Sequence, residues 1–171
     1  MYRPPLYSAS MKHIVAIALG SNIGDAAANV HSAFKRLTPV LGDARLSKLY
    51  ESAPMYHTDQ AKFVNAMAVG TSSENPTTIL NILKNIEKEL GRGATFRNGP
   101  RVIDLDIVLF GNIVFQDEHL QIPHPRMAER PFVLIPLREL AADWPHPQTG
   151  KTVAAMADEL AWNRNDLHEL A

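Results

Sequence analysis

The chain has 171 residues, 46% of them hydrophobic and 20% charged, which fits one globular domain large enough to bury a substantial core. Its 17 Lys and Arg residues balance 18 Asp and Glu residues, so no overall positive field favours nucleic-acid binding and any basic site must be local. Cysteine is absent, which excludes disulfides, thiolate metal sites and thiol nucleophiles.

The first regular structure is expected after an N-terminal extension. Residues 1–11 show no periodicity, and we interpret them as a tail or linker. Residues 13–20, HIVAIALG, form an apolar, β-branched run that predicts a central strand and is too short to span a membrane. A helix should follow, with Asp25 as its N-cap and Pro39 at its exit. We therefore expect an intracellular protein that uses no membrane segment.

Two further strands are predicted, with a long loop between them. Residues 45–51 have an extended pattern, and residues 63–71, FVNAMAVGT, alternate with period two. This alternation places Phe63 and Asn65 on one face of the second strand. The loop 52–62 is longer than a plain hairpin connection needs, and loops of this length often carry function.

A well-delimited helix and a buried strand come next. Asn75 and Pro76 are typical of a helix start, and Gly91 is typical of a helix end. The stretch 99–111, GPRVIDLDIVLFG, predicts a buried strand. A two-residue turn should then lead to a short hairpin partner, IVF at 113–115.

The last third of the chain predicts two helices. One is expected over residues 131–140, with Pro136 as a source of a kink, and the other over residues 151–160. We assign residues 12–162 to a single domain and residues 163–171 to a C-terminal tail.

The order of these elements indicates the fold class. Strand, helix, strand, strand, helix, strand is the split β-α-β order of ferredoxin-like folds. We therefore expect an α+β fold, with a βαββαβ core, an antiparallel sheet, and an added C-terminal hairpin and helices. Both core helices should cover one face of the sheet, and the other face should stay open for a site built by loops.

Two carboxylates interrupt the buried stretch 99–111. Asp104 and Asp106 are two residues apart in a strand, so their side chains share one face, about 7 Å apart along the strand. A divalent cation would relieve their repulsion, and Mg²⁺ commonly uses one or two carboxylates together with water and substrate phosphates. The alternative is that both aspartates pair with arginines or face water.

Several cationic and polar side chains could complete such a site. Arg92, Arg97 and Arg101 precede or enter the aspartate strand, and their forked donors match phosphate oxygens; otherwise they are solvated surface residues. His124, between two prolines, could contact phosphate or belong to a rigid turn. Asn65 could hydrogen-bond the edge of a heterocycle or only satisfy a neighbouring backbone group. A phosphate-binding P-loop sequence and the protein-kinase motifs are absent.

These residues stand in motifs that resemble a known family. Residues 97–108, RNGPRVIDLDIV, closely resemble the signature of the 6-hydroxymethyl-7,8-dihydropterin pyrophosphokinases of folate biosynthesis. ALGSNIGD, FVNA, IEKELGR and IPHPRMAERPFVL resemble other motifs of that family, in the same order. The resemblance covers residues 12–160.

The resemblance implies a transferase that moves a pyrophosphoryl group from ATP to the pterin and releases AMP, with two Mg²⁺ ions held by Asp104 and Asp106. It implies a catalytic set of Arg92, Arg101, Asp104 and Asp106. The implied ATP contacts are Glu87, Arg97, Arg101, Ile107, His124 and Arg130. The implied pterin contacts are Ser52, Ala53, Met55, Phe63, Asn65, Asp104 and Phe132.

The resemblance also frames the expected partners and the alternatives. ATP and the pterin are the expected ligands, without nucleic acid or membrane, and fusion to other folate enzymes is known in the family. The expected location is the cytoplasm, or the mitochondrion if the chain comes from a eukaryotic fusion enzyme. The alternatives are a metal-dependent phosphohydrolase and a non-catalytic ferredoxin-like ligand-binding module.

Overall fold

A computed structural model describes residues 11–91, 93, 97 and 99–171 of the chain. The elements are, in chain order, β1 (His13–Ser21), α1 (Ala26–Leu37), β2 (Gly42–Leu46), β3 (Tyr50–Ser52), β4 (Phe63–Ser72), α2 (Pro76–Glu89), β5 (Asp104–Phe110), β6 (Phe115–Gln116), β7 (Gln121–Ile122), the 3₁₀ turn η1 (Met127–Glu129), α3 (Pro131–Ala141), α4 (Val153–Glu159) and β8 (Leu167–Glu169). None of the helices in these parts of the chain has the length and apolar character that crossing a membrane requires.

The main sheet has the strand order β5-β1-β4-β3-β8, and β2 pairs with another part of β4. All of its pairings are antiparallel. This arrangement confirms the predicted α+β fold with a ferredoxin-like core. The segment 45–51, predicted as one extended stretch, is divided between β2 and β3 at residues 47–49, where the Ser47 Oγ rather than a main-chain carbonyl accepts from the Met67 N–H at 2.9 Å.

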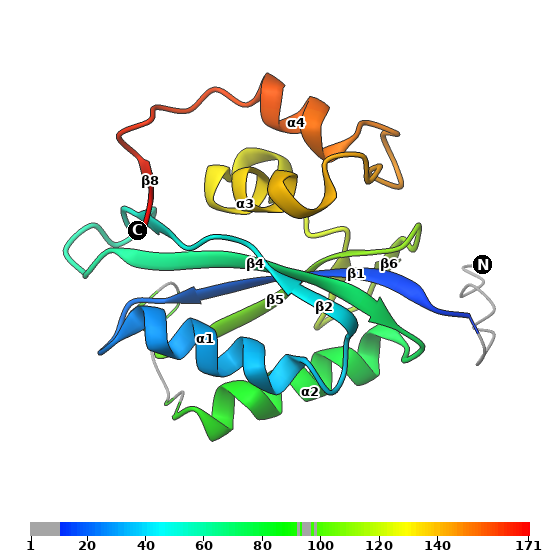
Figure 1. Cartoon of the computed structure of the whole chain (residues 1–171), viewed down its shortest axis with the longest axis horizontal. Helices are drawn as coiled ribbons and strands as arrows, with labels where there is room; N and C mark the ends of the chain where they lie inside the picture. Colours follow the sequence, from blue (N-terminus) through cyan, green and yellow to red (C-terminus); the bar gives the residue numbers. More distant parts are fainter. Residues whose placement is uncertain (1–10, 92, 94–96, 98) are drawn as a thin grey trace.

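Helices α1 and α2 cover one face of the sheet, as predicted (Figure 1). Asp25 caps α1 by accepting from the Ala28 N–H at 3.0 Å, and Asn75 caps α2 by accepting from the Thr78 N–H at 2.9 Å. Gly91 has φ +91°, a left-handed conformation that favours glycine and ends α2. The apolar stripes of both helices pack on alternate residues of β1 and β5.

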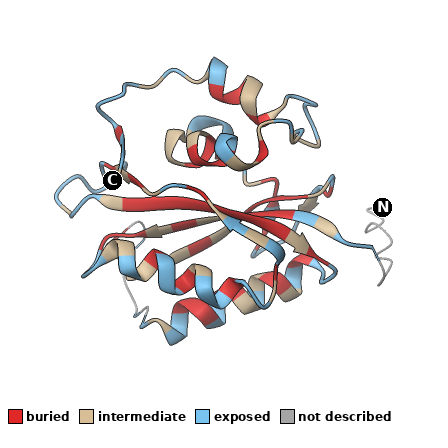
Figure 2. Cartoon of the chain, viewed as in Figure 1, coloured by how far each residue is buried: buried red, intermediate tan, exposed pale blue. Residues whose placement is uncertain are grey.

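The other face of the sheet is not fully open, which corrects the prediction made from the element order. Helices α3 and α4 lie over part of it, and their apolar residues form a second core with Ala16, Met67, Val69 and Val108 (Figures 1 and 2). The site is therefore confined to the end of this face that α3 and α4 leave uncovered.

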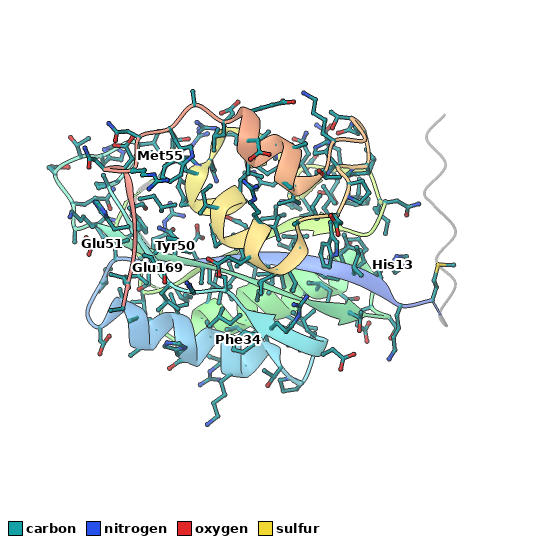
Figure 3. All side chains as sticks on the ribbon, turned by 45° about the horizontal axis from the view of Figure 1, so that its top comes forward. His13, Phe34, Tyr50, Glu51, Met55 and Glu169 are labelled. Carbon is teal, nitrogen blue, oxygen red and sulfur yellow. The ribbon has the colours of Figure 1, made fainter. Side chains whose placement is uncertain are left out.

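Two expectations for the C-terminal half were wrong. The IVF segment at 113–115 does not pair back onto β5; instead Phe115 and Gln116 pair with β7, so the hairpin is a separate two-stranded sheet. Residues 163–171 are not a simple tail, because β8 extends the main sheet by pairing with β3. Tyr50, Glu51 and Glu169 consequently gather at one end of the molecule, far from His13 (Figure 3).

Candidate functional site

A cavity of about 330 Å³ opens on the α3 side of the sheet, next to the loop 53–62. Its volume lies at the small end of the range for small-molecule sites. Its lining residues come from β1, β3, β4, α2, β5, the start of α3 and the loops before β4, β5 and α3: Ala18, Leu19, Gly20, Ser52, Ala53, Met55, Tyr56, Gln60, Phe63, Asn65, Lys84, Arg101, Asp104, Asp106, Val108, His124, Arg130, Phe132 and Val133.

The floor of the cavity is a row of residues across three strands. Gly20 of β1 pairs in register with Asp104 of β5 on one side and with Asn65 of β4 on the other. In the next row, Ala18 separates Asp106 from Met67. Because neighbouring strands lie about 4.8 Å apart, a carboxylate and an amide are held about 10 Å apart with only a glycine between them.

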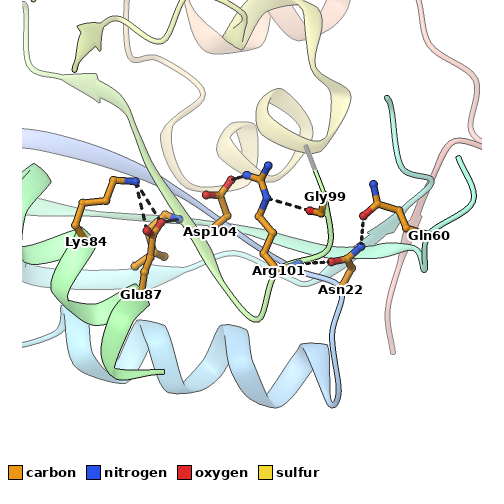
Figure 4. Close-up of polar contacts among 8 residues, drawn as sticks. Asn22, Gln60, Lys84, Glu87, Gly99, Arg101 and Asp104 are labelled. Carbon is orange, nitrogen blue, oxygen red and sulfur yellow. Dashed lines mark hydrogen bonds and ion pairs between the residues drawn. The ribbon is translucent and has the colours of Figure 1, made fainter. Parts of the chain in front are cut away.

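The two aspartates have the geometry that the sequence predicted. Both line the cavity, and Asp104 accepts from the Arg101 guanidinium at 2.6 Å (Figure 4). The pKa of Asp106 is raised to about 6, first by burial and then by the charge of Asp104, with Lys84 and Arg130 partly offsetting the rise. The pairing with arginine that we considered as an alternative therefore exists for Asp104. The charged form of Asp106 stays unfavourable, because burial and the charge of Asp104 both oppose its ionisation.

Glu87 supports the strand from below rather than lining the cavity. It is 3% exposed, and its carboxylate accepts from the Leu105 N–H at 2.8 Å. It also pairs with Lys84 at 3.3 Å, and Lys84 does line the cavity (Figure 4). The sequence analysis missed Lys84, whose helical spacing from Glu87, one turn away, was the available signal.

A β-bulge in β5 brings His124 to the site. Ala16 pairs with Leu109 whereas Ile17 pairs with Ile107, so Val108 is left outside the β1 ladder. The Val108 carbonyl instead accepts from the His124 N–H at 2.9 Å. The extra residue therefore docks the segment that carries His124 beside the aspartates.

His124 is held as a neutral side chain. Burial, followed by the charge of Arg130, lowers the pKa of His124 to about 4. Its Nδ1 accepts from the Arg126 N–H at 3.1 Å, which assigns the proton to Nε2. The imidazole can thus donate one hydrogen bond from Nε2 to an anionic ligand.

Arg130 has one buried polar atom without a hydrogen-bond partner in the part of the chain that the structure describes. Its Nε is buried and has no hydrogen-bond partner within the described residues. Burial, together with the nearby Arg126, lowers the pKa of Arg130 despite the attraction of Asp106 and Asp104. A half-buried guanidinium with an unsatisfied Nε beside two carboxylates is suited to bind an anionic group that arrives with the ligand.

The opposite end of the cavity is aromatic and amide-lined. Phe63 and Phe132 both line it, and the Asn65 Nδ2 donates to the Ser52 Oγ at 2.7 Å. Asn65 is 6% exposed and its Oδ1 lies close to Gly20, so its amide is fixed rather than free to rotate. Such walls are suited to a flat heterocycle with polar edges.

The loop 53–62 is tied to the rest of the site. Met55 and Tyr56 line the cavity although they remain 47% and 43% exposed. The Arg126 guanidinium lies 4.9 Å from the centre of the Tyr56 ring, which joins this loop to the segment after His124.

Most of the predicted site residues meet in this cavity, but three of the described ones do not line it. Glu87 lies beneath it, and the Ile107 side chain lies in the core formed with α1 and α2, 2% exposed. Strand alternation turns the Ile107 side chain away from the aspartates, and the ATP contact that the resemblance implies for Ile107 stays a prediction. Arg97 lies in an exposed turn, and Arg92 lies outside the described residues.

The donor set of the site fits a cation that brings other ligands with it. In the described parts of the chain, no group of three or more His, Cys, Asp or Glu side chains is arranged to hold a metal ion. Among the described residues that line the cavity, Asp104 and Asp106 are the two that offer carboxylate oxygens. Two carboxylates suffice for Mg²⁺ when water and substrate phosphates complete its coordination.

Comparison with known proteins agrees with this geometry. Residues 16–142 match the family described as 7,8-dihydro-6-hydroxymethylpterin-pyrophosphokinase (HPPK). The chain is 43% identical over 132 residues to the 2-amino-4-hydroxy-6-hydroxymethyldihydropteridine pyrophosphokinase of Bacillus subtilis, covering 76% of this chain and 79% of that protein. It is 39% identical over 158 residues to the folic acid synthesis protein FOL1 of Dictyostelium discoideum, covering 92% of this chain but 24% of that relative.

Solved structures share the fold. The HPPK-DHPS of Plasmodium falciparum, crystallised with STZ-DHP, superposes with a TM-score of 0.69 at 15% identity, covering 87% of this chain and 43% of that one. At this identity the likeness supports the fold alone. The chain spans about a quarter of the length of FOL1, and most of the length of the Bacillus subtilis protein.

Proposed function

The chain belongs to the 7,8-dihydro-6-hydroxymethylpterin-pyrophosphokinase family, and on this premise we propose that it transfers a pyrophosphoryl group from ATP to 6-hydroxymethyl-7,8-dihydropterin, releasing AMP, in folate biosynthesis. The row Asp104, Gly20 and Asn65 is the observation that carries the proposal. It places the Asp104 carboxylate, which would face the phosphates, and the Asn65 amide, which would face the pterin, on either side of Gly20.

In this proposal Asp104 and Asp106 hold two Mg²⁺ ions that accompany ATP. When bound, such ions neutralise the charge on the oxygens of the triphosphate. The raised pKa of Asp106 supports the assignment, because a cation at this position would restore the charged form of the carboxyl group. Gly20 and Ala18 beside the two aspartates leave the space that metal and phosphate oxygens need.

The cationic side chains around the aspartates serve the triphosphate. Arg101 and Arg130 contribute forked donors and His124 a neutral N–H, all from the wall of the same cavity. Arg92 and Arg97 remain proposed partners from the preceding loop. Glu87 acts through Lys84 and the Leu105 N–H, rather than by touching the nucleotide.

The pterin occupies the aromatic end. Its ring lies between Phe63 and Phe132, and Asn65 together with the main chain of Ser52, Ala53 and Met55 pairs with its edge. The ring's hydroxymethyl group then points along the floor toward Asp104. Positioning and electrostatic stabilisation account for catalysis, because a loose phosphoryl-transfer transition state demands little covalent help.

A coupled AMP assay tests the proposal. AMP should form from MgATP only when 6-hydroxymethyl-7,8-dihydropterin is added, and chelation of Mg²⁺ should stop it. A metal-dependent phosphohydrolase would instead release nucleotide products without the pterin. A non-catalytic binding module would bind a ligand and give no turnover, and either result would overturn the proposal.

The wider setting is also part of the proposal. The Arabidopsis thaliana relative is named a mitochondrial bifunctional folate synthesis protein, and this chain matches 24% of its length. We propose that the activity works beside, or fused to, other folate enzymes. The cytoplasm is the proposed location, with the mitochondrion in the case of such a fusion.

A further inference from the structure

Asn22 lies directly after β1, at the point where three segments of the site meet. It is 7% exposed, and its hydrogen bonds within the described parts of the chain join it to residues at least 38 positions away. Its partners are Arg101 on one side and the end of the loop 53–62 on the other (Figure 4). A buried polar side chain that joins two distant segments has a defined hydrogen-bonding task.

Toward the phosphate side, Asn22 fixes the main chain of Arg101 from both directions. The Asn22 Oδ1 accepts from the Arg101 N–H at 2.8 Å, and the Asn22 N–H donates to the Arg101 carbonyl at 3.1 Å. The Arg101 side chain, in turn, donates to Asp104 at 2.6 Å and to the Gly99 carbonyl at 3.2 Å. The direction in which the guanidinium leaves the backbone is therefore set by Asn22.

Toward the pterin side, the other end of the same amide holds the loop. The Asn22 Nδ2 donates to the Gln60 Oε1 at 3.0 Å and to the Ala61 carbonyl at 3.1 Å. Ala61 is two residues before Phe63, and Gln60 itself lines the cavity. Both hydrogens of the amide are thus used on the loop that covers the aromatic end.

We infer that Asn22 is a positioning residue that couples the two ends of the cavity, orienting Arg101 and the loop 53–62 through a single side-chain amide. This inference rests on the proposed function for its kinetic consequences, but not for its structural ones. Only an amide offers one acceptor and two donors in this arrangement. Asn22→Asp keeps the oxygen that accepts from the Arg101 N–H, but it replaces the amide nitrogen by an anionic oxygen that repels the Gln60 Oε1 and the Ala61 carbonyl. It should therefore free the loop 53–62 and leave the Arg101 main chain in place. Asn22→Ala should free both the loop 53–62 and the Arg101 main chain.

Amide hydrogen exchange tests the coupling without using catalysis. In Asn22→Asp, exchange in residues 53–62 should accelerate by about tenfold while the Arg101 N–H stays protected, and in Asn22→Ala both should accelerate. Asn29→Asp is the matched control, because Asn29 donates to Ser21 Oγ and to the Ile23 carbonyl in the same turn but touches neither segment. Equal acceleration in the control, or no selective release in Asn22→Asp, would overturn the inference.

Steady-state kinetics provide the second readout. Asn22→Asp should raise the pterin KM by about tenfold with little change in kcat, whereas Asn22→Ala should also lower kcat. If Asn22 acts on kcat through Arg101, Asn22→Ala should lower kcat no further in an Arg101→Ala background. Fully additive losses would contradict the inference. Absence of pterin-dependent AMP in the wild-type protein would instead refute the proposed function and leave the exchange test standing.

Discussion

The guanidinium carbon of Arg130 lies 5.6 Å from the centre of the Phe132 ring. Arg130 precedes α3 and Phe132 lies in its first turn, so the start of one helix carries both a cation and an aromatic ring of the cavity wall, which we propose to serve the phosphates and the pterin, respectively. A displacement of α3 would disturb both subsites together.

Arg130→Met should make the protein more stable and less active. The substitution removes a buried Nε without a partner and keeps most of the apolar stem over Phe132. We expect the melting temperature to rise by about 2–4 °C, the equivalent of roughly 1 kcal/mol for a domain of this size. The KM for ATP should increase by about tenfold or more. A lower melting temperature would show that the attraction of Asp104 and Asp106 outweighs the burial cost.

Asp106→Asn should separate stability from activity in a pH-dependent way. The pKa of Asp106 is raised from 3.8 to about 6, so the folded protein holds a proton that the unfolded chain has already released between these pH values. Ionised Asp106 therefore destabilises the fold above pH 6, and this cost disappears as the pH falls to 4. In EDTA at pH 8 the variant should be more stable by on the order of 1–3 kcal/mol.

Urea unfolding at pH 8 and pH 4 measures this difference. Mg²⁺ added at pH 8 should stabilise the wild-type protein and not the variant, and the variant should lose pterin-dependent AMP formation by about a thousandfold or more. Equal stabilisation by Mg²⁺ in both proteins would move the metal site away from Asp106.

Gly20→Ala should obstruct the floor of the cavity. A Cβ on Gly20 would lie 3.3 Å from the Asn65 Oδ1 and 3.9 Å from the Phe63 ring, so the Asn65 amide must shift. We expect the pterin KM to rise by about tenfold while the ATP KM changes little. Gly93→Ala is the matched control, since a Cβ there would have no neighbour within 4 Å among the described residues. An unchanged pterin KM in Gly20→Ala would place the heterocycle elsewhere.

His124 should remain neutral through the physiological range. Because burial and Arg130 lower the pKa of His124 to about 4, its protonation favours the unfolded chain, and stability should fall as the pH drops from 6.5 toward 4. Nitrogen NMR should report the Nε2–H tautomer at pH 7 and a titration near pH 4. The Arg130→Met variant should titrate higher. A wild-type midpoint near 6.5 would contradict the geometry of the site.

The sequence predicted the parts of this molecule whose causes are local. The caps Asp25 and Asn75 signal their helices within a few residues, and strand alternation alone places Asp104 and Asp106 on one face. The bulge at Val108 was missed because no glycine or proline marks it in the sequence. It forms where β5 pairs with β1 and also accepts a hydrogen bond from the His124 N–H. Strand β8 was missed because three residues gain their structure only from the exposed edge of β3.

The hydrogen bonds that join distant segments of the site could not be predicted from residue spacing, because they depend on tertiary contacts. Asn22 is separated by 79 residues from Arg101 and by 38 from Gln60, so GSNIGD indicated a turn but not its partners. The side chain of Ile107 is the opposite case, because the alternation already in the sequence directs it into the core, whereas the ATP contact that the resemblance implies for Ile107 stays a prediction.

The alternation in β5 also bears on how the chain reaches its native state. A slip of β5 by one residue against β1 would exchange the faces, driving Asp104 and Asp106 among the apolar side chains of α1 and α2 and exposing Leu105 and Ile107. Burying an unpaired carboxylate costs several kcal/mol, so misregistered pairings of the edge strand are strongly disfavoured. Asp104 and Asp106 thus help to specify the register of β5 against β1 as the sheet forms. Substitutions that neutralise them should permit species with a slipped register, which are prone to aggregate during refolding.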